Sequence, residues 1–344
     1  MRAVQFNAPG DVSVVDRPEP TPVEATDAIV RVVATCVCGS DLWPYRGETE
    51  RLAGTPIGHE FVGVVEEIGR EVSVVRRGDF VIAPFQWSDN TCANCVHGFS
   101  SVCMHGGGWD AATGGGQGEF VRVPLADGTL VTVPGGRPDE TMIASLLSLS
   151  DVFATGHHAA VSARVGPGAT VAVVGDGAVG LSGVLAAQRL GAERIITFSR
   201  YPDRQRLAMR FGATDIIATR GDDAVTELLD LTGGVGADAT LECVGTGQSM
   251  TTAFRVARAG SIVGFVGVPH GVEVPVGAMF RRNVGLAGGV APARSYAEQL
   301  LPDVLAGSVR PGEVFDYRVE FDSLPEGYRA MDERRAIKAW SIVS

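Results

Sequence analysis

The chain has few lysines, few cysteines and no long hydrophobic run. Its 29 basic residues include Lys338 as the only lysine and are outnumbered by 40 acidic residues, so the formal net charge is -11. This balance disfavours a nucleic-acid partner, which needs clustered basic residues on one face. No window reaches about 18 uninterrupted apolar residues, and residues 1–6 resemble a strand rather than a secretion signal. We therefore expect no membrane partner and a cytoplasmic location.

The six cysteines stand at positions 36, 38, 92, 95, 103 and 243. This uneven spacing in a long chain without a secretion signal favours metal binding or reactive thiols over a disulfide framework. The hydrophobic content of 45% and the charged content of 20% are those of a folded protein, which sets aside disorder and fibrous repeats. A length of 344 residues predicts two domains.

The pattern of elements changes near residue 150. Before it, short β-branched runs separated by glycine-rich turns predict a β-rich half. After it, strands predicted over 170–174, 194–198, 215–217, 237–242 and 261–266 alternate with helices predicted over 178–190, 202–211, 224–231 and 248–257. This alternation predicts a doubly wound parallel sheet. Beyond about residue 290 we expect a helix over 295–305, a strand-like segment over 315–321, a helix over 324–332 and a last strand near 337–343.

A phosphate-binding loop follows the strand predicted over 170–174. Its sequence, Gly175-Asp176-Gly177-Ala178-Val179-Gly180, has the G-x-G-x-x-G pattern and opens a good helix sequence. Gly175 permits a tight turn, Gly177 lets the backbone approach a pyrophosphate, and Gly180 lets the helix pack closely. The first helical residues, Ala178 and Val179, offer N–H groups at a positive dipole end. We predict dinucleotide binding here.

The residues after the next predicted strand indicate which dinucleotide. An enzyme that uses NAD would place a carboxylate there for the ribose 2′-OH, whereas a nearby arginine accommodates the 2′-phosphate of NADP. This chain has Ser199 and Arg200 at that point. We therefore predict NADP(H) in preference to NAD(H).

Two groups of metal-ligand residues precede the loop. Cys38 and His59 offer a thiolate and an imidazole in glycine-bearing segments, which suit an open catalytic zinc site. Cys92, Cys95 and Cys103 form the second group, and Asp89, three residues before Cys92, is its expected fourth ligand. His97 and His105 are alternatives to Asp89, and a redox cysteine pair or a site that no longer holds metal remain other interpretations of this segment.

Together these segments resemble the zinc-dependent medium-chain dehydrogenase/reductase family, the alcohol dehydrogenases in the broad sense. The resemblance extends over nearly the whole chain and rests on these segments: Met1-Arg2-Ala3-Val4 with Pro9-Gly10-Asp11, Cys38-Gly39-Ser40-Asp41, Gly58-His59-Glu60 with Gly63, the cysteines at 92 to 103, Glu119 to Pro124, Thr155-Gly156 with Ala159, and the glycine loop. It implies a GroES-like catalytic domain formed by residues 1–150 and 290–344, with a Rossmann cofactor domain over 151–289 inserted between them.

The resemblance also implies roles for single residues. Cys38, His59 and Asp151 match the three catalytic zinc ligands, with Asp151 expected in the helix that follows the β-rich half. Glu60 matches a carboxylate that enters the zinc shell during ligand exchange. Asp41 matches the carboxylate that orients the histidine ligand.

Further matches concern the proton path and the nicotinamide. Ser40 matches the hydroxyl that passes on the alcohol proton. Many family members continue this relay with a histidine three residues later, but here Trp43 stands at that position. Val266 and Val268 match backbone segments beside the nicotinamide.

The predicted function is that of an alcohol dehydrogenase, or a ketone or aldehyde reductase, with two zinc ions per chain and a small alcohol or carbonyl substrate. Hydride would move between the substrate carbon and the nicotinamide while zinc polarises the substrate oxygen. A zinc-free quinone or enoyl reductase of the same superfamily and a non-catalytic dinucleotide-binding protein are the alternatives. The family habit predicts a homodimer or homotetramer.

Overall fold

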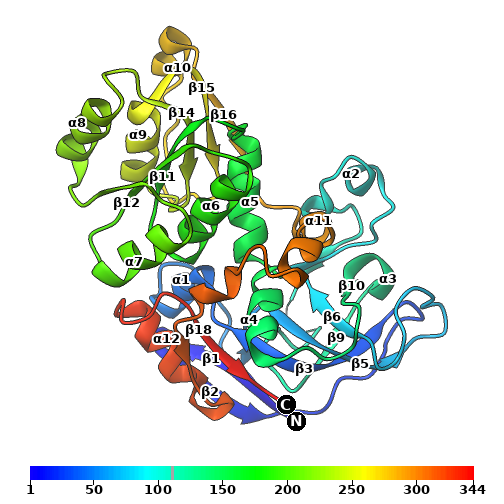
Figure 1. The fold of residues 1–344 in the computed structure, drawn as a ribbon. Coiled ribbons are helices and arrows are strands. Elements are labelled where there is room, and N and C mark those ends of the chain that lie inside the picture. The colour runs from blue at the N-terminus through cyan, green and yellow to red at the C-terminus, as the bar shows by residue number, and fades with distance from the viewer. Residues whose placement is uncertain (110–111) are drawn as a thin grey trace. The chain divides into compact units, whose positions relative to one another are not determined.

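The computed structural model describes residues 1–109 and 112–344, and its chain divides into two compact units. The first unit contains residues 1–151 and 292–344, and the second contains residues 152–291. Both termini belong to the first unit (Figure 1). Within the described residues, no helix combines the length and apolar character that a membrane crossing requires.

The first unit is built around the long strand β3 (Ala28–Cys36). Its other strands are β1 (Arg2–Ala8), β2 (Asp11–Asp16), β4 (Thr55–Pro56), β5 (Phe61–Ile68), β6 (Phe80–Ala83), β7 (Gln86–Trp87), β8 (Gly107–Gly108), β9 (Phe120–Val123), β10 (Val131–Thr132), β17 (Tyr317–Arg318) and β18 (Ala339–Ile342). Its α-helices are α1 (Leu42–Tyr45), α2 (Ala93–Val96), α3 (Ala126–Thr129), α4 (Glu140–Ser148), α11 (Ala293–Leu305) and α12 (Leu324–Asp332). Short 3-10 helices are η1 (Gly39–Asp41), η2 (Ser100–Val102), η3 (Pro311–Val314) and η4 (Phe321–Ser323).

The main sheet of this unit joins both ends of the chain. Its order is β10-β6-β5-β3-β18-β17, and β9 pairs with the first half of β3. β3 runs antiparallel to β5 and to β18, so a strand from the last residues of the chain lies beside a strand from the first forty. The side chains of β3 point alternately to the two faces of the sheet. Nearly all of them are buried, because both faces of β3 are covered.

The second unit has the predicted alternation of strands and helices. Its strands are β11 (Thr170–Val174), β12 (Arg194–Phe198), β13 (Asp215–Ile217), β14 (Ala237–Glu242), β15 (Ala257–Phe265) and β16 (Gly285–Gly288). Its helices are α5 (Val152–Ser162), α6 (Ala178–Arg189), α7 (Pro202–Arg210), α8 (Gly221–Leu231), α9 (Gly247–Val256) and α10 (Val276–Arg282). All strand pairs are parallel, in the order β13-β12-β11-β14-β15-β16. This is the strand order of a doubly wound dinucleotide-binding sheet, and the predicted α/β fold is confirmed.

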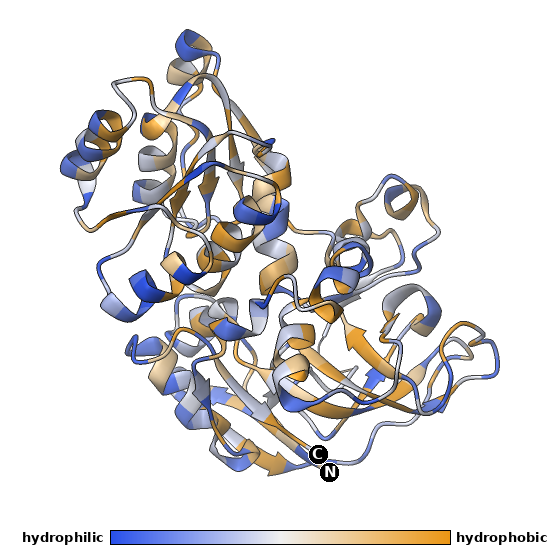
Figure 2. Cartoon of the chain, in the orientation of Figure 1, coloured by the Kyte–Doolittle hydropathy of each residue, from blue (hydrophilic) through white to orange (hydrophobic). Residues whose placement is uncertain are grey.

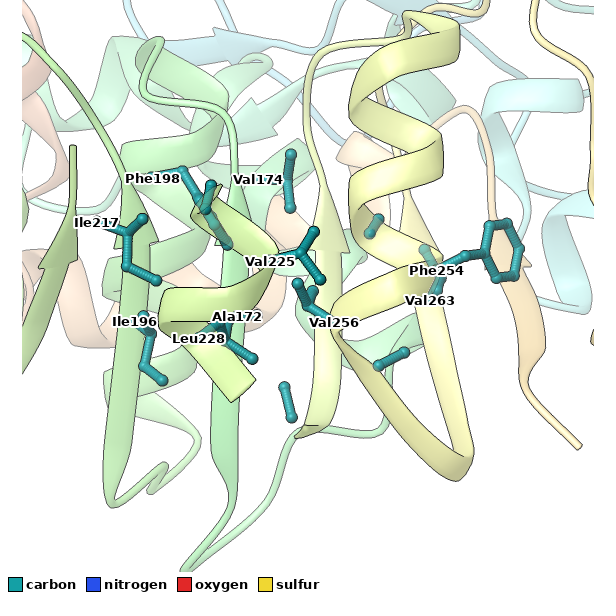
Figure 3. Packing of buried hydrophobic residues seen from close by; sticks show 14 of the residues in the cluster. Ala172, Val174, Ile196, Phe198, Ile217, Val225, Leu228, Phe254, Val256 and Val263 are labelled. Atoms are coloured by element: carbon teal, nitrogen blue, oxygen red, sulfur yellow. The ribbon is translucent and has the colours of Figure 1, made fainter. Parts of the chain in front are cut away.

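One core cluster of the second unit lies between the sheet and helices α8 and α9. Ile196 and Phe198 from β12 face Val225 and Leu228 from α8, as Figure 3 shows. Figure 2 shows hydrophobic residues along these strands, while the charged helix α7 is hydrophilic over most of its surface. Parallel strands buried on both faces need such continuous apolar runs, which is why their limits could be predicted closely.

Three expectations for single segments need correction. The strand-like segment over 315–321 contains only the two residues of β17, and Phe321 begins the 3-10 helix η4. β15 begins at Ala257, before the predicted strand start at Ser261. Asp151 lies in the turn between α4 and α5 rather than in a helix, because α4 ends at Ser148 and α5 begins at Val152.

Candidate active site and metal centres

The sheet register brings the first group of candidate ligands together. Thr35 of β3 pairs with Phe61 of β5, and Cys36 pairs with Trp340 of β18. The residues just beyond these pairs, at 38, 59, 60 and 338, therefore leave the sheet at one edge. Asp151 joins them from the turn after α4, and the backbone carbonyl of Ser150 accepts a hydrogen bond from the Phe85 N–H at 2.9 Å.

Three ligand atoms converge at distances that suit one metal ion. The Cys38 Sγ and Asp151 Oδ2 atoms are 3.4 Å apart, and the His59 Nε2 and Asp151 Oδ2 atoms are also 3.4 Å apart. Zinc bonds of about 2.0 to 2.3 Å in a tetrahedron separate ligand atoms by roughly 3.3 to 3.8 Å. Cys38, His59, Glu60 and Asp151 each offer one atom within 4.8 Å of the others. The donor set fits zinc.

Asp41 contacts both His59 and Cys38. Its Oδ1 lies 3.3 Å from His59 Nδ1, and its Oδ2 accepts a hydrogen bond from the Cys38 N–H at 3.0 Å. A carboxylate on Nδ1 holds the proton on that nitrogen and leaves Nε2 free to bind a metal. Asp41 thus connects two of the candidate ligands.

The electrostatics of this cluster favour a cation. Burial raises the pKa of Cys38 to about 11, and Asp151 and Glu60 add to this rise. Burial opposes a charge on His59, but Asp41 and Cys38 hold its pKa well above the usual value. Acidic groups around one buried point contribute to both pKa shifts, and a divalent cation there would offset their repulsion.

Glu60 forms a buried ion pair with Lys338, the only lysine in the sequence. Lys338 Nζ lies 2.7 Å from Glu60 Oε1 and donates to the Val37 carbonyl at 3.1 Å. Both side chains are buried, and the other carboxylate oxygen of Glu60 has no hydrogen-bond partner among the described residues. Sequence reasoning missed this ion pair because 278 residues separate its members.

A second buried network holds the segment that carries His59. Gln117 donates to the Cys36 carbonyl at 2.9 Å and accepts from Tyr328 Oη at 2.9 Å. Gly58, with a φ of +88°, packs so closely on Gln117 that a Cβ there would lie 2.4 Å from its side chain. The close approach requires glycine before His59.

The second group of candidate ligands forms a separate cluster. The Cys92 Sγ atom lies 3.6 Å from Cys95 Sγ and 3.8 Å from Cys103 Sγ, close to the edge of roughly 3.8 Å expected for a tetrahedral zinc site with thiolate ligands. Asp89 offers an oxygen within 4.8 Å of all three sulfurs. The donor set fits a closed zinc site with one carboxylate corner.

The two histidines near this cluster occupy different positions. His105 Nδ1 lies 2.6 Å from Asp89 Oδ2, so this histidine contacts the carboxylate of the four-donor cluster. His97 is exposed, and its Nδ1 is 2.7 Å from the Ala93 carbonyl. The backbone N–H groups of Cys95 and Met104 lower the pKa of Cys92 to about 7, which favours the thiolate that a metal needs.

The glycine loop makes a tight turn between β11 and α6. Gly175 has a φ of +122°, a region that favours glycine. A Cβ on Gly180 would lie 2.0 Å from the Gly175 carbonyl oxygen, whereas the same atom on Gly177 would meet nothing within 4 Å. The loop therefore closes on itself at Gly180 and leaves open space beside Gly177, where α6 begins.

The specificity position contains a contact that sequence reasoning missed. Ser199 follows β12 and is fully buried, and its hydroxyl donates to Asp176 Oδ2 at 2.7 Å. Arg204 Nη1 lies 3.3 Å from Asp176 Oδ1. Arg200 is exposed, and no hydrogen bond or ion pair joins its guanidinium to the described residues. The acidic residue Asp176 inside the glycine pattern is the sequence feature that could have indicated this contact.

The remaining predicted residues lie in separate segments. Ser40 is half-buried in η1, and its hydroxyl has no hydrogen-bond partner among residues 1–109 and 112–344. Val266 follows β15, and its N–H donates to the Glu242 carbonyl at 2.9 Å. Val268 is exposed. Phe85 packs edge-on against the His59 ring, with 6.4 Å between the ring centroids.

Comparisons with known proteins agree with this geometry. Residues 24–135 match the family model of the alcohol dehydrogenase GroES-like domain, and residues 178–305 match that of zinc-binding dehydrogenases. Zinc-type alcohol dehydrogenase B of Aspergillus flavus is 32% identical over 349 residues, covering 98% of this chain and 80% of the relative. The probable zinc-binding alcohol dehydrogenase Rv1895 of Mycobacterium tuberculosis is 33% identical over 335 residues, covering 95% of this chain and 84% of the relative.

The solved structure of alcohol dehydrogenase TADH from Thermus sp. ATN1 is 30% identical, with a TM-score of 0.92 and full coverage of both chains. A GroES-like unit with zinc donors and a Rossmann unit define a zinc-type alcohol dehydrogenase, an oxidoreductase. The chain belongs to the zinc-dependent medium-chain dehydrogenase/reductase family. The predicted family and the GroES-like character of the first unit are confirmed, and the family and the donor sets together support zinc as the metal.

Proposed function

We propose that the protein transfers hydride between NADP(H) and an alcohol/carbonyl pair at a zinc ion held by Cys38, His59 and Asp151. The observation that carries this proposal is the convergence of the three donors: Cys38 Sγ and His59 Nε2 each lie 3.4 Å from Asp151 Oδ2. Zinc, when bound, supplies a Lewis acid for the substrate oxygen, and the nicotinamide supplies or accepts the hydride. The first unit is then the catalytic domain and the second is the cofactor domain.

The chain's own residues bind, orient and move a proton. Asp41 keeps the His59 ring oriented and its Nδ1 protonated, so Nε2 stays available as a ligand. Ser40 receives the alcohol proton during oxidation and returns it during carbonyl reduction. Trp43 has no group that could continue this relay, so the proton leaves Ser40 by another route. Phe85, beside His59, supplies an apolar wall for the substrate.

The cofactor proposal rests on the residues after β12. Gly175, Gly177 and Gly180, with the first N–H groups of α6, receive the pyrophosphate. Arg200, exposed and free of an ion pair within the described chain, is the cation for a 2′-phosphate. Ser199 lies at the same strand end, and the segment from Val266 to Val268 lies beside the nicotinamide.

A second zinc ion is proposed at Asp89, Cys92, Cys95 and Cys103. Four donors without an open position suit a structural ion, which stabilises the segment instead of taking part in the reaction. With this ion the chain holds two zinc ions. A homodimer or homotetramer and a cytoplasmic location stay predictions of the sequence.

The test of the catalytic site combines metal analysis with turnover. We expect the purified protein to oxidise secondary alcohols with NADP and to contain two zinc ions per chain. His59→Ala, Cys38→Ala and Asp151→Ala should each lose one zinc equivalent and nearly all activity, since an open three-ligand site has none to spare. His97→Ala is the matched control, and it should keep both ions. Full activity in His59→Ala would refute the proposal.

The test of the proton path uses Ser40→Ala. This variant should keep zinc and cofactor but slow turnover by ~10²-fold or more, the usual effect of a lost proton-transfer group. The comparison is made under conditions where hydride transfer limits the rate, shown by a deuterium isotope effect. Unchanged turnover there removes Ser40 from the mechanism.

The test of cofactor choice compares kcat/KM for NADPH and NADH. A charge-assisted contact of about 1.5 to 3 kcal/mol corresponds to roughly 10- to 150-fold in affinity. We expect NADPH to be favoured by at least one order of magnitude. Ser199→Asp should reverse this preference, because a carboxylate repels the phosphate and accepts from a ribose hydroxyl. Equal efficiency with both cofactors contradicts this part of the proposal.

A further inference from the structure

The glycine loop carries an acidic residue that contacts the specificity position. Asp176 accepts a hydrogen bond from the Ser199 hydroxyl at 2.7 Å, and Arg204 Nη1 lies 3.3 Å from the other carboxylate oxygen. Arg204 also donates to the backbone carbonyl of Asp176 at 3.3 Å. The Asp176 and Arg204 side chains are each 13% exposed. The carboxylate therefore comes from the loop before α6, not from the end of β12.

This arrangement occupies two groups that a 2′-phosphate would use. A serine hydroxyl has one proton, so Ser199 cannot donate to Asp176 and to a phosphate at the same time. The Arg204 guanidinium faces a carboxylate of opposite charge and lies over the Tyr201 ring, 5.1 Å from its centroid. Of the cations named here, Arg200 alone has no ion pair within the described part of the chain.

The position of Ser199 is set independently of the hydroxyl. Its N–H donates to the Ile217 carbonyl at 3.0 Å, and its carbonyl accepts from the Gln205 amide at 2.8 Å. These backbone contacts keep Ser199 in place when its side chain changes partner. At Ser199, it is therefore the hydroxyl proton that can change its hydrogen-bond partner while the backbone stays in place.

We propose that Asp176 is a specificity-determining residue that limits the preference for NADP(H). Its carboxylate holds the Ser199 proton and balances Arg204, and it repels a 2′-phosphate while accepting from a 2′-hydroxyl. This inference rests on the proposed cofactor function. Removing the charge of Asp176 weakens its contacts with Ser199 and Arg204 and removes its repulsion of a 2′-phosphate, so the preference for the phosphorylated cofactor increases.

The experiment measures binding rather than turnover. Dissociation constants of NADPH and NADH are determined by nicotinamide fluorescence for wild type, Asp176→Asn and Arg204→Gln at one ionic strength. Asparagine keeps the size and an acceptor oxygen for Ser199, but it has no charge. We expect Asp176→Asn to raise the affinity ratio of NADPH over NADH by ~10-fold or more, since charged contacts are about twice as strong as neutral ones. Arg204→Gln should lower the ratio.

The matched control is Asp203→Asn, which removes one negative charge from the exposed start of α7. Asp203 pairs with Arg206 on the same helix and is 80% exposed. The Asp203→Asn variant should keep the affinity ratio of NADPH over NADH within twofold of wild type. A thermal unfolding transition for each variant shows that the protein is folded, and adenosine 2′,5′-bisphosphate against 5′-AMP repeats the comparison without the nicotinamide.

The outcomes separate this inference from the cofactor proposal. The wild-type ratio tests the preference for NADPH, whereas the change from wild type to Asp176→Asn tests the role of Asp176. If wild type prefers NADH, the cofactor proposal fails and the shift in Asp176→Asn still decides the inference. An Asp176→Asn ratio within threefold of wild type, or equal weakening of both cofactors in both variants, overturns it and leaves Asp176 as a structural partner of Arg204.

Discussion

Replacing Lys338 by methionine should destabilise the protein strongly, because the change leaves a buried carboxylate without its counter-charge. The Lys338 and Glu60 side chains are 1% and 0% exposed, and 2.7 Å separates Nζ from Oε1. Methionine has a similar length and fills the same apolar space. The variant therefore removes the charge with little change in side-chain volume.

The magnitude follows from burial. Breaking a buried ion pair by removing one partner costs about 3 to 5 kcal/mol, because the remaining charge stays desolvated. The Val37 carbonyl also loses the hydrogen bond that Lys338 donates at 3.1 Å. In the double variant Lys338→Met with Glu60→Gln both charges are absent, so we expect the free energy of unfolding to return to within about 1 to 2 kcal/mol of wild type.

The assay is a double-mutant cycle of denaturant unfolding. Wild type, both single variants and the double variant are compared at one fixed zinc concentration, since bound metal adds to stability. The expected coupling energy is at least about 2 kcal/mol. Lys338→Arg serves as the control, and it should recover most of the stability because it keeps the charge. A Lys338→Met variant within about 1 kcal/mol of wild type would refute the reasoning.

Three further predictions concern other parts of the chain. Asp89→Ala should bring the zinc content from two towards one per chain and lower the melting temperature while turnover persists, and retention of both ions would move the fourth ligand to His105. Burial, with the charges of Arg189 and His158, lowers the pKa of His157 to about 4. The unfolded chain therefore binds a proton that the folded chain does not, and stability falls as pH drops from about 6.5 towards 4. In denaturant titrations over this range, His157→Leu should show a shallower loss, and an unchanged pH slope contradicts the assignment. Gly180→Ala should weaken dinucleotide binding in a fluorescence titration, because the added Cβ meets the carbonyl of Gly175 at 2.0 Å.

Local patterns predicted the second unit better than the first. The limits of β11, β12 and β14 were predicted to the residue, since buried parallel strands are uninterrupted apolar runs between glycine-rich turns. In the first unit, the two-residue strands β7 and β8 are held by their pairing with each other. No local pattern in the sequence indicates such a strand.

The residues of the candidate site also differ in how well the sequence predicts them. Cys38 and His59 were apparent from residue type, whereas Asp151 could be assigned only from the resemblance to a family. The pairing of Glu60 with Lys338 depends on the antiparallel neighbours of β3, which sequence periodicity does not report. The contact between Asp176 and Ser199 also joins two loops, although each lies beside a motif that the sequence analysis identified.

The position of β18 next to β3 has a consequence for synthesis on the ribosome. Domains generally fold as units while the chain emerges, beginning from the N-terminal end. Here residues 152–291 form a unit whose whole sequence is available before residues 292–344 are made. The second unit can therefore complete its sheet first, while β3 still lacks the neighbour that pairs with Cys36. Until Lys338 emerges, the nascent first unit carries Glu60 without its partner, so we infer that this region stays open to water and to chaperones until translation is nearly finished.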